Sequence, residues 1–232
     1  MGALLAAAGL FLGIHLFVSG TRLRDVITAK TGEGPYLGLF ALSSLGAIVW
    51  LCIAYNHASA SEANTVLFDA GLAFRHIAAL PVMLIAFLLI VPGVLRGNPT
   101  SQGQAQAKID GVLRITRHPF LWGVMLWSGF HLIAVGTEAA VIFFGTFFLV
   151  SALGIRAIDG KVKRKRPQDW TEISARTSAI PFAAIAERRN VFAAREYFDW
   201  RLLIAIAVFA ALALFHTRLF SVPAFPPAWF SL

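Results

Sequence analysis

Six apolar segments separated by basic loops constrain this chain more than any other feature of its sequence. Each segment approaches the length of about 20 residues that an α-helix needs to cross a bilayer. The chain is 58% hydrophobic and only 14% charged, whereas a soluble domain carries about 25% charged residues. We therefore predict an all-α fold, a polytopic membrane bundle of about six transmembrane helices, at Ala3–Ser19, Tyr36–Tyr55, Leu72–Val91, Pro119–Val135, Ala139–Ile155 and Leu202–Phe215.

The basic residues lie in alternate loops, and this pattern predicts the orientation. Of the 20 Lys and Arg residues, 18 fall between the first and second, third and fourth, or fifth and sixth segments. Such loops face the cytoplasm, so both termini are expected on the opposite side. The longest basic stretch, residues 156–200, contains the run Lys161–Arg166. This run favours anionic lipid headgroups over nucleic acid, because no aromatic residues alternate with the basic ones.

The chain is expected to divide near residue 200. Residues 1–200 would form the main membrane bundle with its cytoplasmic basic segment 156–200. Residues 201–232 would add a C-terminal transmembrane helix and a tail. The loop Arg96–Gly111 is rich in Gly, Gln and Ser, a composition typical of a flexible linker.

Four of the six histidines lie within or at the ends of apolar segments: His15, His76, His118 and His131. Ionisable groups are costly in hydrocarbon and usually face a cavity, a cofactor or a partner. His118 and His131 are about 20 Å apart along one helix, so they do not bind one small ion together. Ligands would come from different helices, as a haem bound within a bundle requires.

Depth along straight helices suggests one way to pair these histidines. On the predicted topology, His76 and His131 lie toward the outer face, and His15 and His118 toward the cytoplasmic face. Arginines near either end would then neutralise haem propionates, and the candidates are Arg75, Arg114 and Arg117.

The stretch Arg117-His118-Pro119-Phe120-Leu121-Trp122-Gly123 resembles the NnrU family of bacterial membrane proteins, which includes the ζ-carotene isomerases. Further matches follow in order over roughly residues 10–185: His15 before Ser19-Gly20 and Leu23-Arg24, then His131-Leu132 and Gly136.

This resemblance implies a protein of the bacterial inner membrane, in a family of which some members bind haem b, and the basic loops then place both termini in the periplasm. The iron ligands implied by the resemblance are His15 and His131, with His76 as the alternative from depth. The depth argument places Arg114 beside the cofactor, and Arg117 and His118 would form a catalytic, supporting or switching site. The implied functions are haem-dependent cis–trans isomerisation of a hydrophobic polyene, or a role in nitrite and nitric oxide metabolism.

A second resemblance leads to another function. Arg117-His118-Pro119 with Gly123 is also similar to the isoprenylcysteine and phospholipid methyltransferases, which bind S-adenosylmethionine at the cytoplasmic face. Those families add a Glu-Glu pair after the next hydrophobic segment, where this chain has Arg156-Ala157-Ile158-Asp159-Gly160. A methyltransferase and a non-enzymatic membrane assembly factor are therefore the alternatives to a haem protein.

Overall fold

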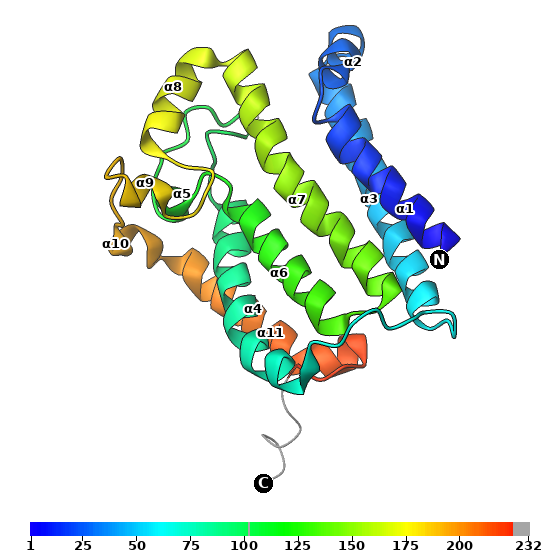
Figure 1. Ribbon diagram of the computed structural model, residues 1–232. Coiled ribbons are helices and arrows are strands. Elements are labelled where there is room, and N and C mark those ends of the chain that lie inside the picture. Colours follow the sequence, from blue (N-terminus) through cyan, green and yellow to red (C-terminus); the bar gives the residue numbers. More distant parts are fainter. Residues whose placement is uncertain (102, 225–232) are drawn as a thin grey trace. The chain divides into compact units, whose positions relative to one another are not determined.

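The computed structural model describes residues 1–101 and 103–224, and most of these are helical (Figure 1). Within this part no strand is present apart from an isolated antiparallel bridge between Val66 and Thr137. The all-α prediction is confirmed. The end of the predicted tail, residues 225–232, lies outside the described residues. The helices are α1 (Gly2–Leu12), η1 (Gly13–Val18), α2 (Leu23–Thr31), α3 (Glu33–Ser59), α4 (Gly71–Leu95), α5 (Val112–Ile115), α6 (Pro119–Val135), α7 (Glu138–Lys165), α8 (Pro167–Arg176), α9 (Ala183–Ala186), α10 (Ala194–Tyr197) and α11 (Trp200–Phe220).

Four of these helices, α3, α4, α7 and α11, are long and apolar enough to cross a membrane. A fifth span results if α1 with η1 is joined to α2, although the two parts are bent by 77°. Helix α6 has the predicted bounds, Pro119–Val135, but its 17 residues make it shorter than the other candidates. The prediction of about six spans is therefore slightly higher than the four or five that the helices support.

The chain forms two compact units, and each is built from two separate stretches. The first contains Met1–Asp69 and His131–Lys161, and the second contains Ala70–Phe130 and the chain from Val162 onward. In the first unit α1 and α3 lie side by side, and in the second α4 and α11 do so (Figure 1). Small side chains line the first of these contacts, including Ala7 and Ala8 of α1 and Ala47 and Ala54 of α3. Such residues let membrane helices approach closely.

Two glycines permit the contact between α4 and α6 in the second unit. A Cβ atom on Gly123 would lie 2.6 Å from the carbonyl oxygen of Ala86 and 2.5 Å from Ile90 Cγ1. A Cβ atom on Gly93 would lie 2.7 Å from the backbone nitrogen of Phe120. The glycine of the Arg117–Gly123 stretch therefore has a packing role, because a side chain there would separate the two helices.

Pro92 interrupts the hydrogen bonding of α4, and a side chain from a distant segment compensates. Proline has no N–H, so the carbonyl of Leu88, four residues earlier, loses its helical donor. The hydroxyl of Tyr197 donates to this carbonyl at 2.6 Å. Burial, with the nearby charge of Asp199, raises the pKa of Tyr197 to about 12, so the hydroxyl keeps the proton that it donates.

We expect Tyr197→Phe to lower the free energy of unfolding by about 1–3 kcal/mol, because the Leu88 carbonyl is left without a donor. Pro92→Ala restores a backbone N–H that can bond the same carbonyl. In a double-mutant cycle measured by denaturant unfolding in detergent, the Tyr197→Phe loss should shrink in the Pro92→Ala background. An equal loss in both backgrounds would show that this hydroxyl does not replace the missing helical bond.

Candidate functional site

His15 lies in a turn of π-helix, η1, that follows α1 directly. Single π turns inside α-helices are rare and are frequent at functional sites. The His15 Nδ1 atom lies 2.8 Å from the carbonyl oxygen of Phe11, so Nδ1 carries the proton and donates it. The lone pair of Nε2 therefore points away from η1, toward α3, where the hydroxyl of Ser44 donates to it at 3.2 Å. A histidine fixed in this way presents Nε2 as a ligand atom.

A series of aromatic rings connects His15 to His131 within the first unit. The ring of His15 lies 4.2 Å from that of Phe11, measured between centroids, and Phe11 lies 5.4 Å from Phe147 on α7. Phe143 and Phe144 of α7 continue the series at spacings of 5.2 and 5.0 Å. Phe144 then stacks on His131 of α6 at 5.0 Å.

The two imidazoles of this unit therefore lie in apolar, aromatic surroundings. Imidazole nitrogens are the usual axial ligands of haem b, and the flat apolar macrocycle suits contact with aromatic rings. His15 and His131 thus have the chemistry that a haem requires. No group of three or more His, Cys, Asp or Glu side chains that could hold a metal ion by themselves occurs in residues 1–101 and 103–224.

The other predicted site residues, His76, Arg114, Arg117 and His118, belong to the second unit. His76 is half-buried near the start of α4. Arg117 and His118 are 8% and 3% exposed, in the extended connection that leads into α6.

The segment Thr116–His118 is held by the backbone that follows α8. The Thr116 hydroxyl donates to the carbonyl of Ala179 at 2.9 Å, and the Arg117 N–H donates to that of Ser178 at 3.0 Å. The Trp122 indole N–H also donates to Ala179, at 2.7 Å. Pro119 is the first residue of α6, as predicted, and its missing N–H costs nothing there. The motif thus locks the start of α6 to residues 178–179.

The Arg117 guanidinium lies over the ring of Trp170 on α8, with its Cζ atom 5.0 Å from the ring centroid. The carbonyl of the same residue accepts a hydrogen bond from the Asn98 amide at 2.9 Å. These contacts tie both α8 and the 96–111 loop to the motif. The loop was predicted to be a flexible linker, but its two ends are held by side-chain bonds.

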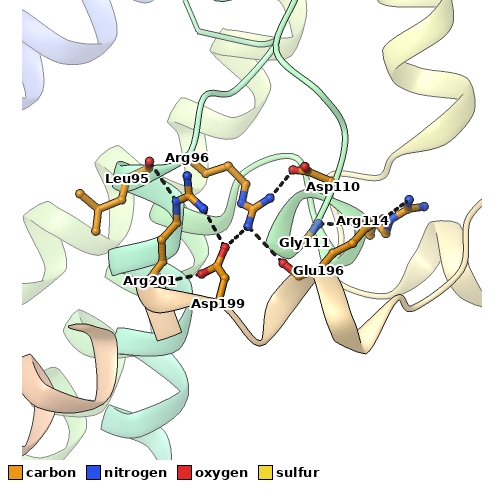
Figure 2. A network of polar contacts seen from close by, with 8 residues as sticks. All are labelled: Leu95, Arg96, Asp110, Gly111, Arg114, Glu196, Asp199 and Arg201. Atoms are coloured by element: carbon orange, nitrogen blue, oxygen red, sulfur yellow. Dashed lines mark hydrogen bonds and ion pairs between the residues drawn. The ribbon is translucent and has the colours of Figure 1, made fainter. Parts of the chain in front are cut away.

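Arg114 and Arg96 are the centres of an ion-pair network that joins the 96–114 region to the start of α11 (Figure 2). Arg114 forms a bidentate ion pair with Glu196, with Nε and Nη2 at 2.6 and 2.8 Å from the two carboxylate oxygens. Its Nη1 group donates to the side-chain oxygen of Asn190 at 2.7 Å. Arg96 pairs with Asp110 and, at 2.6 Å, with Asp199. Asp199 also pairs with Arg201 at 2.7 Å and accepts the Arg201 backbone N–H, which caps α11.

Sequence reasoning missed the acidic half of this network, and it also missed the partners of His15. Glu196 and Asp199 lie on either side of Tyr197, only a few residues before the last span. Their position beside the membrane surface was the sequence signal that could have identified them as ion-pair partners. Phe11 stands four residues before His15, so one helical turn brings the two together. Nothing in the sequence singles out Ser44 or Phe40, because their contacts with His15 cross between helices.

The sequence model of the NnrU protein family matches residues 3–224, nearly the whole chain. The chain belongs to the NnrU family. It is also 26% identical, over 191 residues, to the 15-cis-zeta-carotene isomerase of Arabidopsis thaliana chloroplasts. That alignment covers 81% of this chain and 52% of the plant protein, so the chain spans about half the length of this relative. No solved structure matches.

The NnrU match extends through α11, beyond the stretch of residues 10–185 in which the resemblance was recognised. The matched region includes both units, so it contains His15 and His131 as well as the Thr116–His118 segment. The family comparison supports the first of the two resemblances found in the sequence.

The ion pair with Arg114 changes the protonation of Glu196 in this NnrU protein. The hydrogen bonds from Arg114 lower the pKa of Glu196 from 4.5 to about 2. A lowered carboxyl pKa stabilises the fold above the unfolded value, and this stabilisation is lost as the pH falls from about 4.5 toward 2. We expect Glu196→Gln to lower the Tm near neutral pH and to flatten its fall in that acid range, as followed by thermal unfolding in detergent.

Glu187→Gln is the matched control for this experiment. Glu187 also pairs with an arginine, Arg189, at 2.6 Å, but its side chain is 57% exposed. Exposed pairs contribute little, so this variant should unfold as the wild type does at every pH. A Glu196→Gln profile that coincides with the wild-type profile would mean that the network does not stabilise the fold.

Proposed function

We propose that this NnrU protein binds haem b between His15 and His131 and isomerises an elongated polyene. The observation that carries the proposal is the presentation of His15, whose Nδ1 is bonded to its own helix while Nε2 faces α3. The similarity to a zeta-carotene isomerase supports the polyene as the substrate class. Cis–trans isomerisation changes no atom count and needs no net oxidant or reductant.

The aromatic series between the two histidines also offers a binding surface for the polyene or the haem. Its phenylalanines, on α1 and α7, offer flat apolar faces to which a conjugated chain or a macrocycle can pack. Phe11, Phe143 and Phe144 are only 7–8% exposed, and buried apolar surroundings of this kind limit the access of water to a reactive centre. Bound haem would supply an iron that acts as a Lewis acid or a one-electron centre beside the polyene.

The roles proposed for Arg114, Arg117 and His118 are supporting ones. All three lie in the second unit, where Arg114 is engaged by Glu196 and Asn190, and Arg117 and His118 are buried. On the orientation inferred from the basic loops, this region faces the cytoplasm of a bacterial inner membrane, with the termini in the periplasm. Movement of this region would alter the start of α6, and the same helix carries His131 in its last turns.

The first test is the absorption spectrum of the detergent-purified protein, oxidised and reduced, with a pyridine haemochrome assay. We expect a stoichiometric b-type spectrum, lost in His15→Ala and in His131→Ala. His57→Ala is the control, because His57 is exposed near the end of α3 and should leave the spectrum unchanged. His76→Ala separates the two ligand pairings, since it removes the spectrum only if His76 replaces His15.

A colourless protein that takes up no added haem would refute the proposal. Binding of S-adenosylmethionine by such a protein would identify a methyltransferase, and binding of neither would favour an assembly factor. A haem spectrum without polyene isomerisation would favour the second function implied by the family, in which the haem serves nitrite or nitric oxide metabolism.

A further inference from the structure

Tyr36 of α3 has a buried hydroxyl that the protein does not satisfy. The residue is 5% exposed, and its Oη atom has no hydrogen-bond partner among the described residues. A buried polar group without a partner is costly, and native proteins contain few of them. A ligand that bonds this hydroxyl would explain why a tyrosine occupies the position and not a phenylalanine.

The hydroxyl belongs to the surroundings of His15. Tyr36, Phe40 and Ser44 are spaced four residues apart, so they share one face of α3. Tyr36 stacks on Phe40 at 6.1 Å between ring centroids, and Phe40 meets the ring of His15 edge-on at 5.4 Å. The Tyr36 and His15 rings are thus at most about 12 Å apart, a span that one elongated ligand can cover.

A buried guanidinium also contacts Tyr36. The Arg24 side chain is 4% exposed, and its Cζ atom lies over the Tyr36 ring, 5.2 Å from the centroid. Arg24 Nη2 binds the Glu33 carboxylate at 2.7 Å, and the Asp25 carboxylate lies 4.0 Å from Nη1. The Glu33 side chain is 57% exposed. Arg24 therefore already binds a carboxylate, that of Glu33. Because the Glu33 side chain is largely exposed, a ligand carboxylate can replace it at Arg24.

We propose that Tyr36 and Arg24 bind the carboxylate of the ligand that lies beside His15. The phenol donates a hydrogen bond and the guanidinium supplies the positive charge, both in buried surroundings where charge-assisted bonds are strong. The inference rests on the proposed function for the presence of a ligand at His15. Two sources share this chemistry: the propionates of haem b, and the terminal carboxylate of an elongated apolar acid.

Tyr36→Phe tests the site, because it removes only a hydroxyl that has no partner within residues 1–101 and 103–224. Haem b and its dimethyl ester are titrated into the full-length protein in detergent and followed by Soret absorbance. Parinaric acid, a fluorescent polyene acid, and its methyl ester form the second pair of probes. Tyr197→Phe is the control, since its hydroxyl is satisfied within the other unit.

We expect Tyr36→Phe to lower the affinity for one of the two acids by about tenfold or more. The matching ester should bind to the variant as it does to the wild type. A lower affinity for haem b would identify its propionates as the carboxylates that Tyr36 binds. A lower affinity for parinaric acid would identify the carboxylate of an apolar acid instead. The Tm of the ligand-free variant should equal or exceed that of the wild type, because the substitution removes a buried hydroxyl that has no partner among the described residues. Tyr197→Phe should bind all four probes with wild-type affinity.

Wild-type affinity of Tyr36→Phe for both acids would overturn the inference, and so would an equal loss for acids and esters. Failure of the proposed function looks different. In that case the wild type binds no haem, or His15→Ala keeps the full spectrum, while the parinaric acid pair still decides whether Tyr36 recognises a carboxylate.

Discussion

The structure depends on one constraint: a chain within a bilayer must satisfy its backbone polar groups internally, because lipid offers no hydrogen bonds. Regular helices do this by themselves, so each irregularity needs a compensating group. Pro92 frees the carbonyl of Leu88, and the Tyr197 hydroxyl bonds it. The extended entry to α6 is bonded to residues 178–179. Both interruptions are thus compensated by groups from segments that are distant in the sequence.

The same constraint explains why His15 is an unusual residue. A π turn holds an extra residue compared with an α turn, which rotates the side chains that follow out of their regular positions. Here the turn carries a histidine whose Nδ1 bonds to the Phe11 carbonyl. Gly20 follows, at a point where a Cβ atom would lie 2.4 Å from the carbonyl oxygen of Leu16. Interruptions of this kind are frequent at functional sites.

The apolar segments could be predicted because burial in lipid leaves a long uninterrupted signal, and α6 begins and ends at the predicted residues. The partners of the charged residues could not be predicted. Arg114 and Glu196 are 82 positions apart, and no local pattern connects them. The Gly, Gln and Ser content of the 96–111 loop suggested flexibility, yet Arg96 and Asp110 near its ends pair with each other. Composition describes the solvation of a segment, but not the tertiary bonds that order it.

The pairing of histidines by depth illustrates a further limit. It assumed straight helices that rise 1.5 Å per residue from one face of the membrane to the other. The first segment violates this assumption, because His15 lies in a π turn and the chain beyond it bends by 77°. A constant rise of 1.5 Å per residue therefore does not describe the chain around His15, whereas His131 lies on the regular helix α6. Since His131 enters both pairings, the choice between them depends on the geometry around His15, where Ser44 and the Phe11 carbonyl fix the direction of Nε2.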